Sequence, residues 1–209
     1  MGSGGSLRPM TRQGVTLYFT LFAVIVWCFT MVPSAWLEKT TAEASSYVLR
    51  ALGLLSSWGV RGDGSYLTLW GEARPVTVQI IRECTAINVF SVMAGLILPL
   101  RNGSLPRKAI GIAFSGLLLF LLNVSRITLT VFLTGFDVPP FSWFLTDPTI
   151  EVYHYPVSFA YGVIGVALLV VMVDKWILPE LGETLMGTFG LFYRSADYAR
   201  RIIFKRKLR

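Results

Sequence analysis

Charged residues and histidine are scarce in this chain, and that scarcity excludes an ordinary soluble fold. Of the 209 residues, only 15% are charged and one is histidine, whereas 54% are apolar. Soluble globular domains carry about 25% charged residues. Together with a mean hydropathy of +0.60, the composition therefore predicts a membrane protein.

Cysteine is nearly absent as well, which excludes several kinds of site. The two cysteines are Cys28 and Cys84, and the sequence holds no CxxC, no HExxH and no cluster of His with Cys. Metal sites in proteins usually need such patterns, so we expect no metal and no cofactor. Cys28 lies halfway along an apolar run and Cys84 at the edge of another, so we expect no disulfide between them.

Positive charge is in excess, with a net charge of +7. In a soluble protein this excess would suggest a nucleic-acid partner. Here the Lys and Arg residues cluster at the ends of apolar runs, and aromatic residues do not alternate with them as a base-stacking surface requires. We therefore expect no nucleic acid, and the positive-inside rule accounts for the basic residues.

Long stretches with almost no charge predict an all-α membrane protein with about four transmembrane helices. A helix of about 20 residues crosses the hydrocarbon core of a bilayer. The predicted spans are 14–37, 84–100, 109–135 and 152–173. A cleaved signal peptide is the alternative for the first run, but Pro33-Ser34-Ala35-Trp36 is a poor cleavage site, so we favour a retained helix.

The longer polar interval, residues 38–83, is predicted to have structure of its own. Within Tyr47–Trp58 the apolar residues recur every three or four positions, which predicts an amphipathic helix. Residues 61–64, with the sequence Arg-Gly-Asp-Gly, predict a turn. The alternating segments 66–70 and 76–80 predict a β-hairpin.

The distribution of charge predicts an orientation. The N-terminus, the 101–108 loop and the tail are basic, whereas 38–83 and 136–151 together hold more acidic than basic residues. By the positive-inside rule, both termini lie in the cytoplasm and these two intervals lie outside the cell membrane. The predicted segments are an artificial linker with the N-terminus (1–13), one membrane domain (14–175) and a basic amphipathic tail (176–209). A disordered tail is the alternative for the last segment.

Three polar residues share one predicted depth at the outer boundary of the membrane. Cys84 begins the second span and His154 lies near the start of the fourth. Arg126 lies 18 residues beyond Lys108, which is about 27 Å along a helix at 1.5 Å per residue. Each residue alone has an ordinary explanation, as a packed thiol, a membrane anchor or a hydrogen-bonded side chain. Their common depth favours a catalytic site.

These three side chains suit acyl transfer through a thioester. Cysteine attacks as the thiolate, and a nearby arginine stabilises both that thiolate and a developing oxyanion. Histidine accepts and returns protons near neutral pH. Asn123 lies one helical turn before Arg126, so it can hydrogen-bond into the same cavity.

The residues Glu83-Cys84-Thr85-Ala86, Asn123-Val124-Ser125-Arg126 and His154 occur in this order at successive outer helix ends. In this order and spacing they resemble the exosortase/archaeosortase family of integral-membrane cysteine transpeptidases. The resemblance covers roughly residues 65–175. Two departures stand out: Ala86 occupies a position where glycine is common, and many relatives have more spans.

The resemblance implies a cysteine protease and transpeptidase that acts on secreted proteins. Its substrates would carry a C-terminal signal made of a short motif, an apolar helix and basic residues. Cys84 would attack the scissile carbonyl, Arg126 would stabilise the thiolate and oxyanion, and His154 would act as acid and base. The acyl group would pass to an amine or a lipid acceptor. The supporting residues are Asn123, Glu83 and Thr85.

Two other classes of function are compatible with the sequence. One is a non-catalytic membrane scaffold or assembly protein that binds a partner helix. The other is a small transporter with Arg126 along its path, although no internal repeat supports it. A functional role for the Cys84 thiol separates the enzyme from both.

Overall fold

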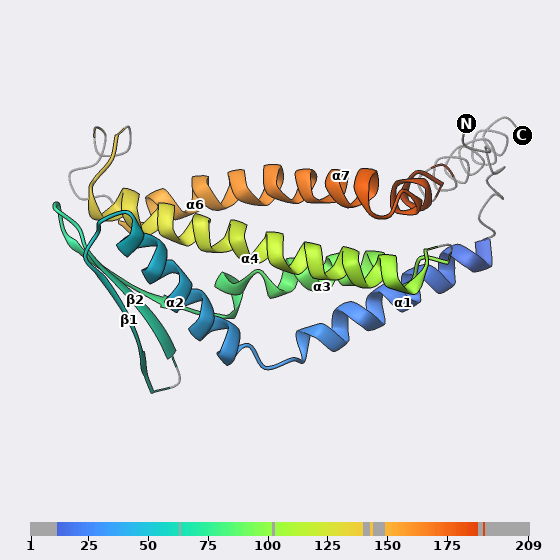
Figure 1. Ribbon diagram of the computed structural model, residues 1–209, viewed down its shortest axis with the longest axis horizontal. Helices are drawn as coiled ribbons and strands as arrows, with labels where there is room; N and C mark the ends of the chain where they lie inside the picture. Colours follow the sequence, from blue (N-terminus) through green and yellow to red (C-terminus); the bar gives the residue numbers. More distant parts are fainter. Residues whose placement is uncertain are drawn as a thin grey trace, which may run out of the picture.

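The computed structural model describes residues 12–62, 64–101, 103–139, 143, 149–187 and 190, and over them the chain is mostly helical. The helices are α1 (Arg12–Thr30), α2 (Ala35–Ala51), α3 (Ile87–Ile97), α4 (Leu105–Gly135), α6 (Ile150–Ala160) and α7 (Val166–Trp176), with the 3₁₀-helix η1 (Arg82–Thr85) and the π-helix η2 (Tyr161–Gly165). The strands are β1 (Ser56–Arg61), β2 (Gly64–Trp70) and β3 (Pro75–Ile80). Figure 1 shows an elongated molecule, with the sheet and α2 at one end and the other helices running away from them.

Three helical stretches in the described part of the chain are long and apolar enough to cross a membrane: Gln13–Thr30, Leu105–Gly135 and Ile150–Trp176. The predicted class of helical membrane protein is therefore confirmed. The predicted span 84–100 differs, because it is helical over only the 11 residues Ile87–Ile97. Such a helix rises about 16 Å, roughly half of the hydrocarbon core. Its first residues form the η1 turn instead.

The first predicted span, 14–37, is divided in two. Helix α1 ends at Thr30 and α2 begins at Ala35, on the far side of Pro33. Proline disfavours the helical conformation in the residue before it, which explains the break. Ser34 then donates a hydrogen bond to Glu38 at 2.7 Å in the first turn of α2.

The predicted amphipathic helix over 47–58 is wrong in its second half. Helix α2 ends at Ala51, and Gly53 has a positive φ of 80°. The amides of Gly53 and Leu54 bond to the carbonyls of Arg50 and Leu49, which is a glycine-terminated helix end. The chain beyond it forms β1, because Gly53 turns it back toward the strands.

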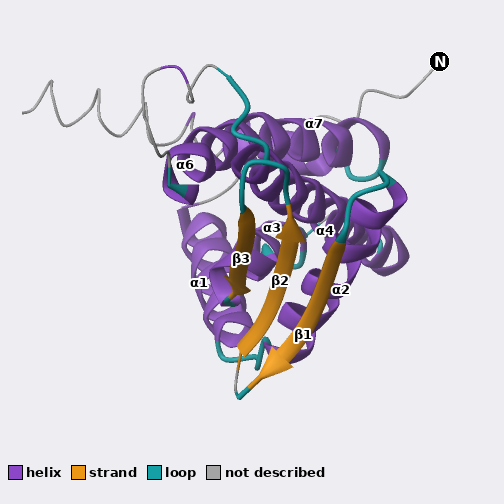
Figure 2. Cartoon of the chain, turned by 90° about the vertical axis from the view of Figure 1, so that its left-hand side faces the viewer, coloured by secondary structure: helices purple, strands orange, loops and turns teal. Residues whose placement is uncertain are grey.

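The predicted hairpin is confirmed and belongs to a three-stranded antiparallel sheet in the order β1-β2-β3 (Figure 2). Strand β2 pairs with β3 from Ser65↔Ile80 to Trp70↔Pro75. The predicted turn at 61–64 joins β1 to β2, and Arg61 pairs with Gly64; Asp63 lies outside the described residues. Strand β1 is an additional strand that the sequence did not predict.

Alternation along the strands gives the sheet one apolar face, which packs on α2 and on the end of α4. The buried residues of this cluster are Ala42, Leu49, Leu67, Leu69, Val76, Ile80, Ile127 and Val131. Small residues on α2, among them Thr41, Ala42, Ser45 and Ser46, are buried beneath the sheet. Such residues let a helix approach the strands closely.

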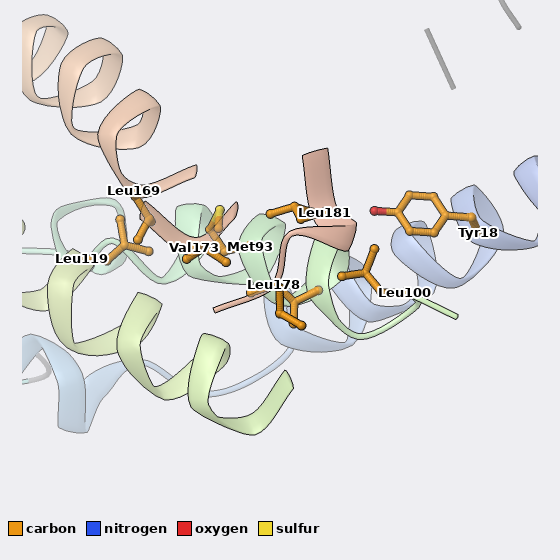
Figure 3. Close-up of a cluster of buried hydrophobic side chains, with 9 residues drawn as sticks. Tyr18, Met93, Leu100, Leu119, Leu169, Val173, Leu178 and Leu181 are labelled. Atoms are coloured by element: carbon orange, nitrogen blue, oxygen red, sulfur yellow. The ribbon is translucent and has the colours of Figure 1, made fainter. Parts of the chain in front are cut away.

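A second apolar cluster holds the helices together at the opposite end of the molecule (Figure 3). It combines Met93 of α3, Leu119 of α4 and Val173 of α7 with Leu178 and Leu181 in the segment after α7. Residues 180–187 are helical. The predicted basic tail lies mostly outside the described residues, as does the predicted linker.

The loop between β2 and β3 rests directly on the end of α4. The amide of Ala73 donates to the carbonyl of Gly135 at 3.1 Å. Arg74 donates to the carbonyl of Thr134 at 3.2 Å and forms an ion pair with Asp137. These bonds satisfy carbonyl groups that a helix leaves free at its C-terminal end. They attach the sheet to the helix that carries Asn123 and Arg126.

The close approach of Gly71 to α4 predicts a loss of stability in Gly71→Ala. A Cβ on Gly71 would lie 2.2 Å from the carbonyl oxygen of Gly135, and such overpacking costs about 1–3 kcal/mol. We expect a clearly lower midpoint of thermal unfolding in detergent. The control is Gly59→Ala in β1, where a Cβ meets nothing within 4 Å. Equal midpoints for the two variants would contradict this interpretation of the contact.

Candidate active site

Cys84 lies in the short turn η1, between the end of β3 and the start of α3. Its thiol is free and partly buried, and it packs at the border of the apolar cluster beneath the sheet. The amide of Cys84 donates to the carbonyl of Ile81 at 2.8 Å, which closes the turn. The cysteine is therefore held by a tight backbone turn rather than within a regular helix.

Arg82 attaches this turn to the end of α1. Its two terminal nitrogens donate to the carbonyl of Val32 at 2.8 Å and to that of Phe29 at 3.2 Å. A cation near the C-terminal end of a helix also interacts favourably with the helix dipole. Thr85 donates its hydroxyl to the carbonyl of Arg82 at 2.6 Å. Thr85 thus supports the turn itself.

Ala86, directly after the turn, has a left-handed backbone with φ 59° and ψ 7°. This conformation costs a residue with a Cβ about 1–2 kcal/mol, whereas glycine adopts it freely. It redirects the chain from the 3₁₀ turn into α3. As noted above, glycine is common at this position in the family that the Cys84 motif resembles. The left-handed conformation gives a physical reason for that preference.

Asn123 connects the turn to α4. Its side chain is buried and its amide nitrogen donates a hydrogen bond to the carbonyl of Cys84. The bond joins residues that are 39 positions apart in the chain. It fixes the backbone of the cysteine against the helix that also carries Arg126, one turn further along.

Ser158 of α6 links Arg126 to His154. The Nη1 atom of Arg126 lies 3.5 Å from the Ser158 hydroxyl, and His154 Nε2 lies 3.4 Å from the same oxygen. The structure therefore brings the predicted residues of α4, α6 and the cysteine turn to one region.

The Nε atom of Arg126 is buried and, among the described residues, has no hydrogen-bond partner. Arg126 is also one of the residues that line a cavity of about 100 Å³, together with Glu83, Asn123, Ser158 and Tyr161. A buried cationic N–H without a partner is costly. Such a donor is suited to a developing negative charge on a bound substrate.

Two residues of the cavity, Ser158 and Tyr161, were not predicted from the sequence. Ser158 lies four positions after His154, on the same face of α6, and this spacing could have revealed it. Tyr161 accepts a hydrogen bond from Ser125 at 3.2 Å and begins the π-helix. A π-helical turn is rare and occurs mainly at functional sites, but a single sequence does not reveal where it forms.

Within the described residues, the Cys84 thiol makes no hydrogen bond to Arg126 or His154. Cys84 and His154 also lie outside the set of residues that line the small cavity. Catalytic hydrogen bonds often form only when substrate is bound. The arrangement is thus one of neighbouring groups rather than a closed triad.

The fold and this site define a helical membrane protein with a cysteine, an arginine and a histidine near the junction of its sheet and its helices. The family model described as "Transmembrane exosortase (Exosortase_EpsH)" matches residues 6–173. The chain belongs to this transmembrane exosortase family.

One similar curated protein is "Archaeosortase A" of Natronomonas pharaonis, which is 28% identical over 174 residues. The matched region covers 74% of this chain and 55% of that protein, so the chain spans about half the length of this relative. No solved structure matches the chain.

The left-handed conformation of Ala86 predicts an order of stability at this position. Ala86→Gly should be at least as stable as the natural chain, because glycine adopts this conformation without strain. Ala86→Val should be less stable by about 1–2 kcal/mol, since its branched side chain tolerates a positive φ poorly. Thermal unfolding in detergent measures both. Equal stability of the Gly and Val variants would contradict the assignment.

Proposed function

We propose that this chain is a membrane-embedded cysteine protease and transpeptidase that cleaves a C-terminal sorting signal from secreted proteins. Membership in the exosortase family supports the class of reaction. Two contacts made by residues of α4 are the main support for the roles proposed for Cys84, Arg126 and His154. Asn123 bonds to the carbonyl of Cys84, and one turn further Arg126 contacts Ser158 beside His154.

In the proposed orientation, both termini are cytoplasmic and Cys84 lies at the outer interface of the cell membrane. The elongated shape supports this arrangement, because the sheet is at one end and the first residues of α1 and α4 are at the other (Figure 1). The basic loop before α4 lies on the side of those helix starts. A substrate with an apolar helix and a basic end would then present its preceding motif to Cys84.

In the first step, the Cys84 thiol gives its proton to His154, and the resulting thiolate attacks the scissile carbonyl carbon of the substrate. The carbonyl oxygen gains negative charge, which the Arg126 guanidinium stabilises. The carbon–nitrogen bond then breaks, and protonated His154 gives a proton to the departing amine. The products are a thioester on Cys84 and the released apolar helix with its basic end.

In the second step, an amine or a lipid head group attacks the thioester. His154 takes the proton from this acceptor, a new bond forms to the carbonyl carbon, and the Cys84 thiolate leaves. Asn123 and Thr85 hold the cysteine turn during both steps. Glu83 lines the same small cavity as Arg126 and completes the set of supporting residues.

Replacement of the nucleophile tests the proposal directly. We expect Cys84→Ala to reduce processing of a co-expressed secreted protein with the three-part C-terminal signal by more than about 1,000-fold. The thermal stability of the variant should be nearly unchanged. The matched control is Cys28→Ala, because Cys28 is exposed on α1 and far from the site in sequence. Normal processing by Cys84→Ala would favour a non-catalytic membrane scaffold.

The role assigned to Arg126 predicts the reactivity of the thiol. In a Cys28→Ser background, Cys84 should react with a thiol reagent at neutral pH about tenfold more slowly in Arg126→Ala. A tenfold change corresponds to about 1.4 kcal/mol of electrostatic stabilisation of the thiolate. Arg126→Lys keeps the charge and should retain most of the rate. If the Ala variant reacts at the original rate, Arg126 does not activate Cys84.

A further inference from the structure

A larger, apolar cavity lies on the membrane side of the cysteine turn, and the proposed reaction does not use it. Its volume is about 440 Å³, and it lies between the α1–α2 junction, the start of α3 and the middle of α4. Phe29, Trp36, Phe90 and Phe120 are among its lining residues. The wall next to Cys84 is formed by Thr85 and Ala86.

The cavity wall carries few polar groups. The two threonines of the wall donate their hydroxyls to backbone carbonyls, Thr40 to Trp36 at 2.8 Å and Thr85 to Arg82 at 2.6 Å. The remaining side chains of the wall are apolar except for the indole N–H of Trp36, a residue that is 62% exposed. The cavity therefore favours a hydrocarbon ligand over a peptide backbone, whose polar groups would be left without partners.

The volume separates two apolar occupants. A helix about 10 Å across that rises 1.5 Å per residue fills about 120 Å³ per residue, so 440 Å³ holds only about one turn. A methylene group occupies about as much space as a water molecule, about 30 Å³. The same cavity therefore holds roughly 15 methylene groups, which is one lipid chain.

Arg82, which bonds to two residues of the cavity wall, supplies a charge that points to the class of lipid. Arg82 donates to the carbonyls of Phe29 and Val32, which both line the cavity, and each of its terminal nitrogens retains a second N–H. These donors suit a phosphate group. The nearest acidic residue in the sequence, Glu83, lines the small polar cavity on the other side.

We propose that this cavity binds one hydrocarbon chain of an anionic membrane phospholipid, with the phosphate of its head group on Arg82. The cavity extends from the cysteine turn along α3 and α4, since its α4 residues Gly116 and Phe120 precede Asn123. Its polar end is at the level of Cys84 and its apolar end lies deeper in the membrane. Binding does not depend on the cysteine chemistry, so its test does not require activity.

The test uses a phosphatidylglycerol probe with a diazirine in one acyl chain, in vesicles of unlabelled phosphatidylcholine that contain the purified full chain. After irradiation, mass spectrometry locates the adducts. We expect them to concentrate on peptides with Phe29, Trp36, Phe90 and Phe120, and excess unlabelled phosphatidylglycerol should displace the probe. Adducts spread evenly over all lipid-facing helices, or displacement only by an apolar peptide, would overturn the proposal.

Two substitutions fill the cavity from opposite walls. A Cβ on Gly116 would lie 3.1 Å from Cε2, on the edge of the Phe90 ring, a side chain that can move. Gly116→Leu, and separately Thr40→Phe, should reduce the adduct yield at least fivefold. The matched control is Ala113→Leu, an exposed position on the same helix that does not line the cavity. If Gly116→Leu and Thr40→Phe give the same adduct yield as Ala113→Leu, the lipid chain does not bind in this cavity.

A second comparison tests the head group. The phosphatidylglycerol probe should give several times more adduct than a phosphatidylcholine probe with the same chain. Arg82→Gln should remove this preference and Arg82→Lys should keep it, because lysine retains the charge. If Arg82→Gln still prefers phosphatidylglycerol to phosphatidylcholine, the phosphate does not bind Arg82. This conclusion holds even if the substitution also weakens the attachment of the cysteine turn to the end of α1.

Discussion

The backbone groups at helix ends, which need hydrogen-bond partners, constrain the whole arrangement. A helix leaves its last carbonyl groups unpaired, and these groups need donors from elsewhere in the protein or from water. Here the segment that follows β2 supplies the donors. Arg74 bonds to the end of α4 and Arg82 bonds to the end of α1. Both arginines flank β3, so this strand connects two membrane helices and leads the chain to Cys84.

The candidate site follows from this connection. Once β3 and η1 are attached to α1, the carbonyl of Cys84 meets Asn123 on α4. Arg126 lies one turn further on α4 and contacts Ser158, which also lies beside His154. The contacts of Arg82, Asn123 and Arg126 each join a different pair of elements. The strained backbone of Ala86 is compatible with this view, because strain persists where the surrounding structure fixes the conformation.

Much of the fold was predictable because its signals are local. Runs without charge predicted the membrane helices, and alternating residues predicted the β2–β3 hairpin. Four features of the fold were missed or misplaced, each for a physical reason. Pro33 divides the first predicted span into α1 and α2. Gly53 ends α2, so the periodic segment 47–58 is divided between helix and strand. Strand β1 carries Ser56, Ser57 and Gly59, which give it little strand character. The predicted second span is shorter because η1 and Ala86 delay the start of α3.

The sequence by itself determined the membrane class and the hairpin, since hydropathy and alternation act along the chain, and it predicted a common depth for Cys84, Arg126 and His154. It did not determine whether these residues are lateral neighbours. That was decided by tertiary contacts: Asn123 with the carbonyl of Cys84, and Ser158 with Arg126 and His154. The physical reason is that depth follows from distance along one helix, whereas contact between helices depends on which faces pack together.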